Sequence, residues 1–465
     1  MIRSAQRELA GWVASRGHSA VPEAARNIGR QSLLDTLAVA FAGRQEDVVT
    51  RTGVYARAMR DGAGTEAWTT GNKYKPEAAA LLNAVSAHAL DYDDITPAWR
   101  GHPGAVIWPA LFAVSHGHEV SYEEVLDTFA LGFEVGAQVG TCLSAHHYGS
   151  GWHSTATMGL ISASAGCARI LGFDADQIFH AIGLAVSQCA GVQGQFGSMA
   201  KPLQAGFAAS AAVRAVQLAG AGVESGDVLE GNAGFSKLYG GVDRLRIELP
   251  SVTSTDLAIT RCGVEVKQFP NCYAGHRAVQ AALELRASVG SDKLDIRAIR
   301  IEGTPGAHQP LLERAPSTVD ESRFSVEYGV ACALLDGKVQ LSSFSDLGLQ
   351  RPDVRNLIGL TTVSENEALG VRRAARVSMT LANGHAVERT VTQLPGTFGD
   401  AAFMRRLGDK VDDCMSHAGL ANHAGALVDA ALSLSGASSA AFARWPVFTR
   451  IWGSSKSDDT NSHER

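Results

Sequence analysis

The sequence AAALLNAVSAHALDYDD at residues 78–94 is the clearest sign of a helical fold. It is a helix-forming run that ends in a group of carboxylates. Alanine and leucine have high helix propensity, so a helix is predicted over residues 78–90. Asp91, Asp93 and Asp94 repel one another unless they are solvated or paired, and they oppose the dipole at a helix C-terminus. We therefore expect Asp93 and Asp94 to pair with buried donors, with a solvated acidic helix end as the alternative.

Similar helical patterns lie on both sides of this stretch and fill residues 1 to about 260, where alanine is frequent and proline is sparse. A capping-box pattern, Ser121 followed by Glu124, opens one of these helices. Two others are rich in small residues, which let helix axes approach closely, so both are expected deep in a bundle. Helices are predicted over residues 33–41, 78–90, 122–136, 155–171 and 202–219.

The pattern changes after about residue 262, where short alternating segments begin. Asn383-Gly384 lies between two such segments and is a strong signal for a two-residue hairpin turn. Strands are predicted over residues 296–301, 375–381 and 386–393, with a helix over residues 324–335.

These patterns predict a mainly α protein with two domains. Residues 1–262 and 400–452 are expected to form a large multihelical domain, and residues 263–399 a smaller α+β domain. The tail at residues 453–465 is polar and is predicted to be disordered.

Composition excludes several classes of protein. The formal net charge of -6 disfavours nucleic acid as a partner, so an anionic substrate needs a locally positive pocket. The cysteine count of 7 is odd and includes no C-x-x-C pair, which argues against a disulfide framework and a thiolate zinc site. Charged residues interrupt the N-terminus, and no run reaches the roughly 18 apolar residues of a membrane span. A soluble, cytoplasmic protein is expected.

Standard cofactor motifs are absent from the sequence. It contains no P-loop, no H-E-x-x-H and no G-x-S-x-G. The glycines at 191, 194 and 197 do not match the dinucleotide fingerprint. The histidine pairs 116/118 and 146/147 lack the spacing and the third ligand of a metal site. No nucleotide, metal or other cofactor is therefore expected.

Two histidines are candidates for proton transfer. His102 lies in GHPG at residues 101–104, where a stiff loop could hold its ring toward a cleft. His153 lies just before a predicted helix N-terminus, whose positive potential favours the neutral imidazole that a general base needs. The alternatives are a surface histidine at 102 and simple helix capping around 153.

Four other residues are candidates for binding or stabilising an anion. Lys201 and Lys267 lie in apolar surroundings, and together with His276 they could clamp two carboxylates. Tyr328 places a hydroxyl on an otherwise apolar helix. The alternatives are lysine chains that reach solvent and a core tyrosine with a satisfied hydroxyl.

Taken together, these segments resemble the MmgE/PrpD family, over about residues 30–400. That family includes 2-methylcitrate dehydratase, cis-aconitate decarboxylase and iminodisuccinate epimerase. The markers, in order, are LLDTLAVAFAG (33–43), AAALLNAVSAHALDYDD (78–94), GHPG (101–104), GWHSTATMG (151–159), MAKPLQAGFAA (199–209), VLEGNAGF (228–235), KQFPNCYAGHRAV (267–279) and FSVEYGVACALLDGKV (324–339).

The resemblance implies a helical domain built from both chain ends, an α+β lid domain and a homodimer. It also implies an active site between the domains without metal, flavin or nucleotide. Its site positions fall on Asp91, His102, His153, Lys201, Lys267, Tyr328 and His276. The decarboxylase branch carries a threonine directly after its second paired aspartate, whereas Ile95 stands there in this chain.

The leading hypothesis is a lyase of the dehydratase type acting on a small di- or tricarboxylate. His153 is the candidate base and His102 the candidate acid, with Asp91 orienting His102. The two lysines hold carboxylates, and Tyr328 donates to the developing oxyanion. The alternatives are an epimerase of an iminodisuccinate-like dicarboxylate, a cis-aconitate-type decarboxylase, and a non-catalytic dimeric binding protein.

Overall fold

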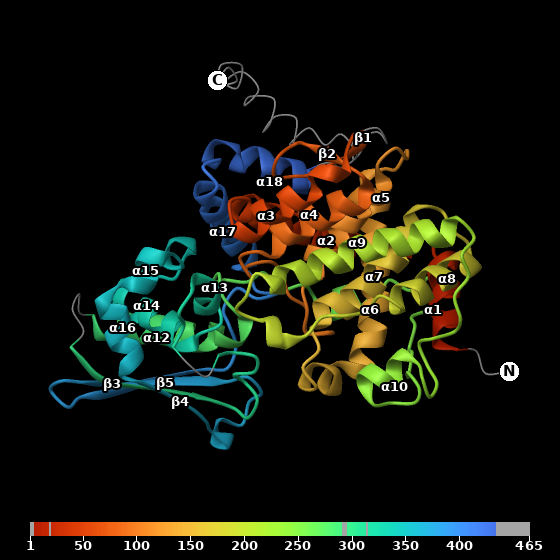
Figure 1. The fold of residues 1–465 in the computed structure, drawn as a ribbon. Coiled ribbons are helices and arrows are strands. Elements are labelled where there is room, and N and C mark those ends of the chain that lie inside the picture. The colour runs from red at the N-terminus through yellow and green to blue at the C-terminus, as the bar shows by residue number, and fades with distance from the viewer. Residues whose placement is uncertain (1–3, 18–19, 291–294, 313–314, 434–465) are drawn as a thin grey trace, which may run out of the picture.

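Helices from both ends of the chain build the larger domain of the computed structural model, which describes residues 4–17, 20–290, 295–312 and 315–433. Near the top of Figure 1, the blue helices of the C-terminal part lie beside the red and orange helices of the N-terminal part. In chain order the helices of this domain are α1 (Ala5–Ser15), α2 (Glu23–Gly43), α3 (Asp47–Ala56), α4 (Pro76–His88), α5 (Gly104–Ser115), α6 (Tyr122–Gly149), α7 (Ser154–Ile170), α8 (Ala175–Val186), α9 (Ala200–Gly220), α10 (Phe235–Gly240), α11 (Ala258–Cys262), α17 (Phe403–His417) and α18 (Ala424–Ser433).

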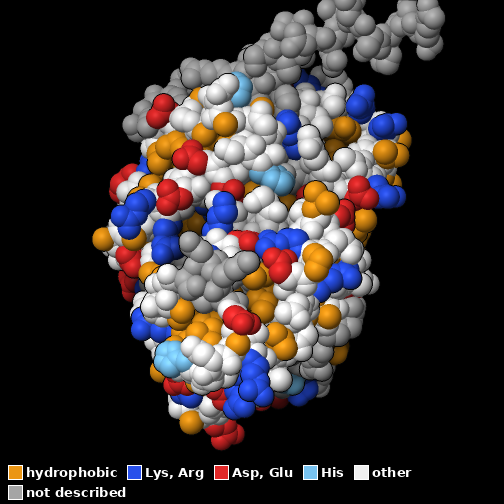
Figure 2. Space-filling view, turned by 90° about the vertical axis from the view of Figure 1, so that its left-hand side faces the viewer, with side chains coloured by type: hydrophobic (Ala, Val, Ile, Leu, Met, Phe, Trp, Pro, Cys, Tyr) orange, Lys and Arg blue, Asp and Glu red, His pale blue; other side chains and the backbone are white. Residues whose placement is uncertain are grey.

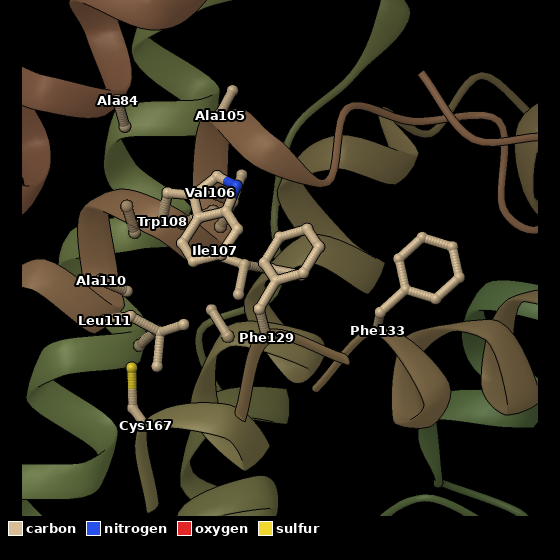
Figure 3. Packing of buried hydrophobic residues seen from close by; sticks show 14 of the residues in the cluster. Ala84, Ala105, Val106, Ile107, Trp108, Ala110, Leu111, Phe129, Phe133 and Cys167 are labelled. Atoms are coloured by element: carbon tan, nitrogen blue, oxygen red, sulfur yellow. The ribbon is translucent and has the colours of Figure 1, made fainter. Parts of the chain in front are cut away.

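The core of this domain forms around α5, a helix that is buried along its whole length. Figure 3 shows its side chains packed against α6, with Trp108 lying on Phe129. The two rings are stacked, with their centroids 4.0 Å apart. Fully burying one large apolar side chain contributes about 1.5–3 kcal/mol, so a helix buried on every side is firmly fixed. The loop that carries His102 ends directly at this helix.

α6 runs to Gly149, well beyond the end at residue 136 that the sequence predicted. The predicted helix ended at a glycine, Gly136. A Cβ on Gly136 would lie 1.9 Å from Oγ of Ser162 on α7, so this glycine serves close helix packing. Gly132 and Gly140 meet neighbouring atoms almost as closely. The long α6 can therefore lie directly against α7.

The smaller domain is a four-stranded sheet with helices on one face (Figure 1). The strand order is β4-β3-β5-β6, in which β3 is parallel to β4 and antiparallel to β5. Alternate residues of β5 are buried beneath the helices, whereas most of β6 is exposed. The elements are α12 (His276–Val289), β3 (Ile296–Gly303), α13 (Val319–Ser322), α14 (Val326–Asp336), α15 (Asp346–Gln350), α16 (Pro352–Gly359), β4 (Thr361–Glu365), β5 (Ala375–Leu381) and β6 (Ala386–Val391).

The structure confirms the predicted fold class, a mainly α chain with a smaller α+β domain. One feature of the larger domain was not predicted, a two-stranded antiparallel hairpin of β1 (Arg60–Glu66) and β2 (Lys73–Tyr74). The domain boundaries at 262 and 400 stay predictions, and the tail at 453–465 lies outside the described residues. No helix among the described residues is long and apolar enough to cross a membrane.

Candidate active site

A cavity of about 190 Å³ is lined by residues from both domains. The larger domain contributes the loop between α4 and α5, the start of α7 and the start of α9. The smaller domain contributes the segments before α12, after β3 and before β5. Five of the seven predicted site residues line this cavity: Asp91, His102, His153, Lys201 and Lys267.

Asp91 holds the two lysines at the cavity wall. Its Oδ1 lies 2.5 Å from Nζ of Lys201 and 3.0 Å from Nζ of Lys267, and all three side chains are buried. The Nζ of Lys267 also donates to the Asp91 carbonyl at 2.6 Å. Burial alone would raise the pKa of Asp91, but the positive charges of Lys201 and Lys267 outweigh it and lower the pKa well below its usual value. The carboxylate therefore stays ionised beside the two ammonium groups.

Lys267 reaches this position because its segment is tied to the loop of the larger domain. Ile95 and Glu265 exchange two backbone hydrogen bonds, of 2.9 and 2.7 Å, two residues before the lysine. Asp91 in turn has a φ of 48°, in the left-handed region that a short polar residue tolerates better than most. The lysines thus meet a carboxylate whose backbone is held in an unusual conformation.

His102 has carboxylates near both ring nitrogens. Its Nδ1 lies 3.2 Å from Oδ2 of Asp93, and its Nε2 lies 3.7 Å from Oδ1 of Asp91. Asp93, rather than the predicted Asp91, is therefore the closer carboxylate, because Asp91 is turned toward the lysines. Burial lowers the pKa of His102, while the negative charge of Asp93 opposes that shift.

His153 has a different environment, which fixes its tautomer. Gln204 donates through Nε2 to the carbonyl of Val192, so its Oε1 faces Nδ1 of His153 at 2.7 Å. The Nδ1 atom therefore carries the hydrogen, and Nε2 keeps a lone pair. Burial, helped by the charge of Lys201, holds the pKa of His153 well below its usual value. At neutral pH the ring is a neutral imidazole, the form that a general base needs.

His88 is a site residue that the sequence analysis missed. It lies at the end of α4, and its Nδ1 is 2.7 Å from Oδ2 of Asp93. Its ring centroid lies 4.6 Å from that of His102 and 5.7 Å from that of His153. Burial lowers its pKa to about 4. The available signal was its place one helical turn before Asp91 on the same predicted helix.

Asp93 and Asp94 are buried and paired, as the sequence predicted. Asp93 is the partner of His88 and His102. Asp94 accepts hydrogen bonds from the backbone N–H of Gly104, at 2.9 Å, and from Ser32. The carboxylate of Asp94 thereby fastens the site loop to the first turn of α5.

Tyr328 and His276 do not line the cavity. The Tyr328 hydroxyl donates to the carbonyl of Ser343 at 2.6 Å inside the smaller domain. The His276 Nε2 lies 3.2 Å from the Asn271 carbonyl, and burial holds the pKa of this ring well below its usual value. The geometry gives no support to the oxyanion role predicted for Tyr328 or to the clamp role predicted for His276.

Ile95 lines the cavity, at the position where the decarboxylase pattern carries threonine. The neighbouring Thr96 does not supply the missing hydroxyl, because its Oγ1 donates to the Gly263 carbonyl at 3.3 Å. Three arginines that the sequence analysis passed over also line the cavity, namely Arg100, Arg372 and Arg373. Arg372 and Arg373 are adjacent in sequence, and folding brings them together with the distant Arg100.

One group of described residues has the composition of a metal site. His88, Asp91, Asp93 and His102 offer ligand atoms within 4.8 Å of one another. Asp91 is already held by two ammonium groups, and His88 by a short contact to Asp93. A divalent cation would stand close to both lysines, so the residues present do not fit one, and we assign no metal there.

The face of the molecule in Figure 2 shows no separate positive region for an anionic substrate. Figure 2 shows Lys and Arg side chains interspersed with Asp and Glu across one face of the molecule. Inside the cavity the lining residues include Lys201, Lys267 and the three arginines, against Asp91 as the single carboxylate among them. The cavity is therefore the locally positive pocket expected from the sequence.

Comparison with known proteins identifies the family. The MmgE/PrpD N-terminal domain model matches residues 7–248, and the MmgE/PrpD C-terminal domain model matches residues 269–434. Curated relatives include the cis-aconitate decarboxylase of Homo sapiens, 27% identical over 346 residues, which cover 71% of this chain and 70% of the relative. That of Aspergillus terreus is 24% identical over 414 residues, or 83% of this chain and 84% of the relative. With both family domains matched in order along one sequence, this chain belongs to the MmgE/PrpD family.

Proposed function

We propose that this chain is a cofactor-independent lyase that acts on a small tricarboxylate. In this proposal it removes a proton beside a carboxylate and then expels a β-hydroxyl group. The observation that carries the proposal is the contrast between two histidines on one cavity, a neutral His153 and a carboxylate-flanked His102. The similarity to cis-aconitate decarboxylases favours a polycarboxylate substrate.

The two lysines can stabilise the negative charge that develops during such a reaction. A proton beside a carboxylate is weakly acidic, because its removal places further negative charge on a group that is already anionic. Fixed positive charge in a buried site stabilises that enediolate-like intermediate without solvent reorganisation. Lys201 and Lys267 are buried and held in place by Asp91, so their ammonium groups are positioned before substrate arrives.

The histidines then divide the proton transfers between them. The lone pair on Nε2 of His153 takes the α-proton, and the electron pair left on carbon forms the new carbon–carbon double bond. The β carbon–oxygen bond breaks, and protonated His102 gives its proton to the leaving hydroxide to form water. Burial lowers the pKa of His102, but Asp93 opposes this shift and favours the protonated ring. No carboxylate of the described residues forms an ion pair with His153.

Decarboxylation is the second candidate, favoured by the similarity to cis-aconitate decarboxylases. In that reaction carbon dioxide leaves, the electron pair of the broken bond stays on carbon, and His102 protonates it. His153 then has no proton to remove. Ile95 in place of the threonine of the decarboxylase pattern disfavours this candidate.

Turnover in D₂O separates the candidates. The purified protein is incubated with citrate, 2-methylcitrate, cis-aconitate, isomeric tartrates and iminodisuccinate, and proton NMR is followed together with absorbance of the unsaturated acid. Elimination gives an unsaturated product from a hydroxy acid, with deuterium entering the α position of recovered substrate. Decarboxylation gives carbon dioxide and one deuterium in the product. Absence of exchange, elimination and decarboxylation with every compound would leave only a binding protein.

A further inference from the structure

A second group of positive charges lies in the outer part of the cavity. Arg100 and Arg373 are half-buried and Arg372 is exposed, whereas Lys201 and Lys267 are almost fully buried. The three arginines also line an adjoining cavity of about 200 Å³. In the part of the chain that the structure describes, no carboxylate forms an ion pair with any of them. Their charge is therefore available to a ligand.

The backbone at this place is strained. Among the described residues, three that are not glycine have a positive φ, namely Asp91 at 48°, Arg100 at 55° and Arg373 at 64°. All three line the same cavity. The left-handed region is unfavourable for arginine, and such conformations persist where surrounding contacts impose them, often at functional sites. Here the N–H of Arg373 donates to Thr304 Oγ1 at 2.9 Å, and the N–H of Arg100 donates to the Thr96 carbonyl at 3.1 Å.

The two strained arginines come from different domains. Arg100 lies in the loop between α4 and α5 of the larger domain, and Arg373 lies just before β5 of the smaller domain. The guanidinium group of Arg100 stands 5.6 Å from the ring centroid of Tyr148, which also lines the cavity. Guanidinium groups form paired hydrogen bonds with carboxylates, so an anion placed between these two would engage both domains.

We propose that Arg100 and Arg373 form an outer subsite for the distal carboxylate of the substrate, so that the site selects three carboxylates over two. The inner lysines hold the carboxylate beside the reacting carbon, and the outer arginines hold the arm that projects away from it. This inference rests on the proposed function only in taking a polycarboxylate as the ligand. It assigns selectivity to residues that take no part in the proton transfers.

Calorimetric binding of two unreactive ligands tests the subsite. Propane-1,2,3-tricarboxylate and succinate differ by one carboxymethyl arm, and neither has a hydroxyl group to lose. The unaltered protein is expected to bind the tricarboxylate at least about tenfold more tightly. Arg100→Gln and Arg373→Gln should each weaken tricarboxylate binding by roughly tenfold to a hundredfold, the loss of one charged hydrogen-bonded contact. Each should weaken succinate binding less than about threefold, because succinate lacks the arm.

Arg297→Gln is the matched control, since it removes the same charge from an exposed position on β3 that does not line the cavity. It should leave both affinities unchanged. Lys267→Met should weaken both ligands. Equal loss of both ligands in the Arg100 and Arg373 variants, or no loss in either, would overturn the subsite. Because neither ligand is turned over, a chain without lyase activity can still show the subsite, and an active chain can lack it.

Arg373→Gly keeps the test meaningful if the glutamine variants fold poorly. Glycine adopts a positive φ without strain, so this variant should unfold at the same temperature as the unaltered protein or higher. It should still lose the preference for the tricarboxylate. A variant that gains stability and keeps the preference would contradict the proposal.

Discussion

At the scale of single residues, the two histidines differ in their neighbours. His102 is placed against carboxylates, and His153 is placed against an amide oxygen and a lysine. Burial lowers the pKa of both rings, but the charge of Asp93 opposes the shift at His102, whereas the charge of Lys201 adds to it at His153. The two rings therefore differ in how readily they hold a proton, which suits a reaction with two proton transfers.

Replacing each histidine by glutamine separates their roles. His153→Gln keeps a polar group of similar size that cannot accept a proton, so turnover should fall on the order of 10²–10⁴-fold while binding is largely kept. His102→Gln should abolish product formation and still allow the α-proton to exchange with solvent, because His153 remains. Product formation and deuterium uptake are measured by proton NMR on the same samples.

If the His153 variant still exchanges the α-proton and the His102 variant does not, then His102 is the base and His153 is the acid. Normal turnover in both variants would remove both histidines from the chemistry. Each variant is compared by circular dichroism with the unaltered protein, so that loss of fold is not mistaken for loss of chemistry.

The pH dependence follows from the lowered pKa of His153. A base must be unprotonated, and a lowered pKa keeps this ring neutral to a pH below its usual 6.5. The acid side of the kcat/KM profile is therefore expected to fall below pH 6.5. Lys201 is one cause of the shift, so Lys201→Met should move that limb to higher pH besides weakening binding. A limb that stays in place in this variant would argue against His153 as the titrating base.

Chelation tests the absence of a metal requirement. The cluster of His88, Asp91, Asp93 and His102 has metal-type ligands, but two ammonium groups stand beside it. Chelator-treated and desalted protein should therefore keep full activity in the NMR assay. Activity lost on chelation and restored by one divalent ion would reverse this expectation.

Sequence reasoning found the site residues that lie in distinctive local sequence, and it missed those that depend on folding. His102, His153, Lys201 and Lys267 stand out because histidine or lysine interrupts apolar or glycine-rich segments. Arg100 and Arg373 are ordinary arginines in sequence, and only the backbone conformation and the cavity distinguish them. Tyr328 was selected for its hydroxyl group, but sequence does not show that a backbone carbonyl already accepts from it.

At the scale of elements, some glycines inside helices mark the close approach of a neighbouring element rather than a helix end. Gly136 lies inside α6 because α7 touches it, which a pattern within one helix cannot reveal. Two helices are longer than predicted, because α2 begins at Glu23 rather than at residue 33 and α6 ends at Gly149 rather than at residue 136. The other predicted helices and strands agree with the structure to within two residues at each end. The hairpin of β1 and β2 was missed, because RDGAGTE carries little strand propensity.

A substitution at Gly101 tests the close approach of neighbouring atoms to a glycine beside the site. A Cβ there would lie 2.7 Å from the Trp99 ring and 2.9 Å from the backbone N of Thr155, at the start of α7. Gly101→Ala should therefore displace His102, and misplacement of about 1 Å can cost about 10²-fold in kcat. Gly149→Ala is the control, since nothing lies within 4 Å of its Cβ position. Steady-state kinetics on both variants checks the expectation, and equal kcat values would contradict it.

At the scale of the whole molecule, the larger domain is closed by α17 and α18, which pack on α2. Lys410 on α17 forms a buried ion pair of 2.5 Å with Asp35 on α2. The same Nζ donates to the carbonyl of Tyr92, next to Asp91. The C-terminal helices therefore support the loop that carries the site, although they lie far from it in sequence.

Leu407→Ala tests this closure. Leu407 on α17 is fully buried in the same core as α2, so the substitution should lower the free energy of unfolding by about 2–5 kcal/mol. Urea unfolding is followed by tryptophan fluorescence, because the described tryptophans all lie in the first third of the chain. Met404→Ala, on the exposed side of α17, should change little. An unchanged tryptophan transition in the Leu407 variant would show that the N-terminal helices are stable without α17.

Because α17 and α18 are translated after the smaller domain, the smaller domain can be completed during synthesis before the larger one. A ribosome adds about 5–20 residues per second, so α2 emerges many seconds before the helices that cover it. The whole smaller domain, including all of its strands, is translated in that interval. The nascent larger domain meanwhile presents the apolar face of α2 to solvent and to any chaperone that is present. A stop codon late in the message would therefore release a chain with a complete smaller domain and an uncovered larger one.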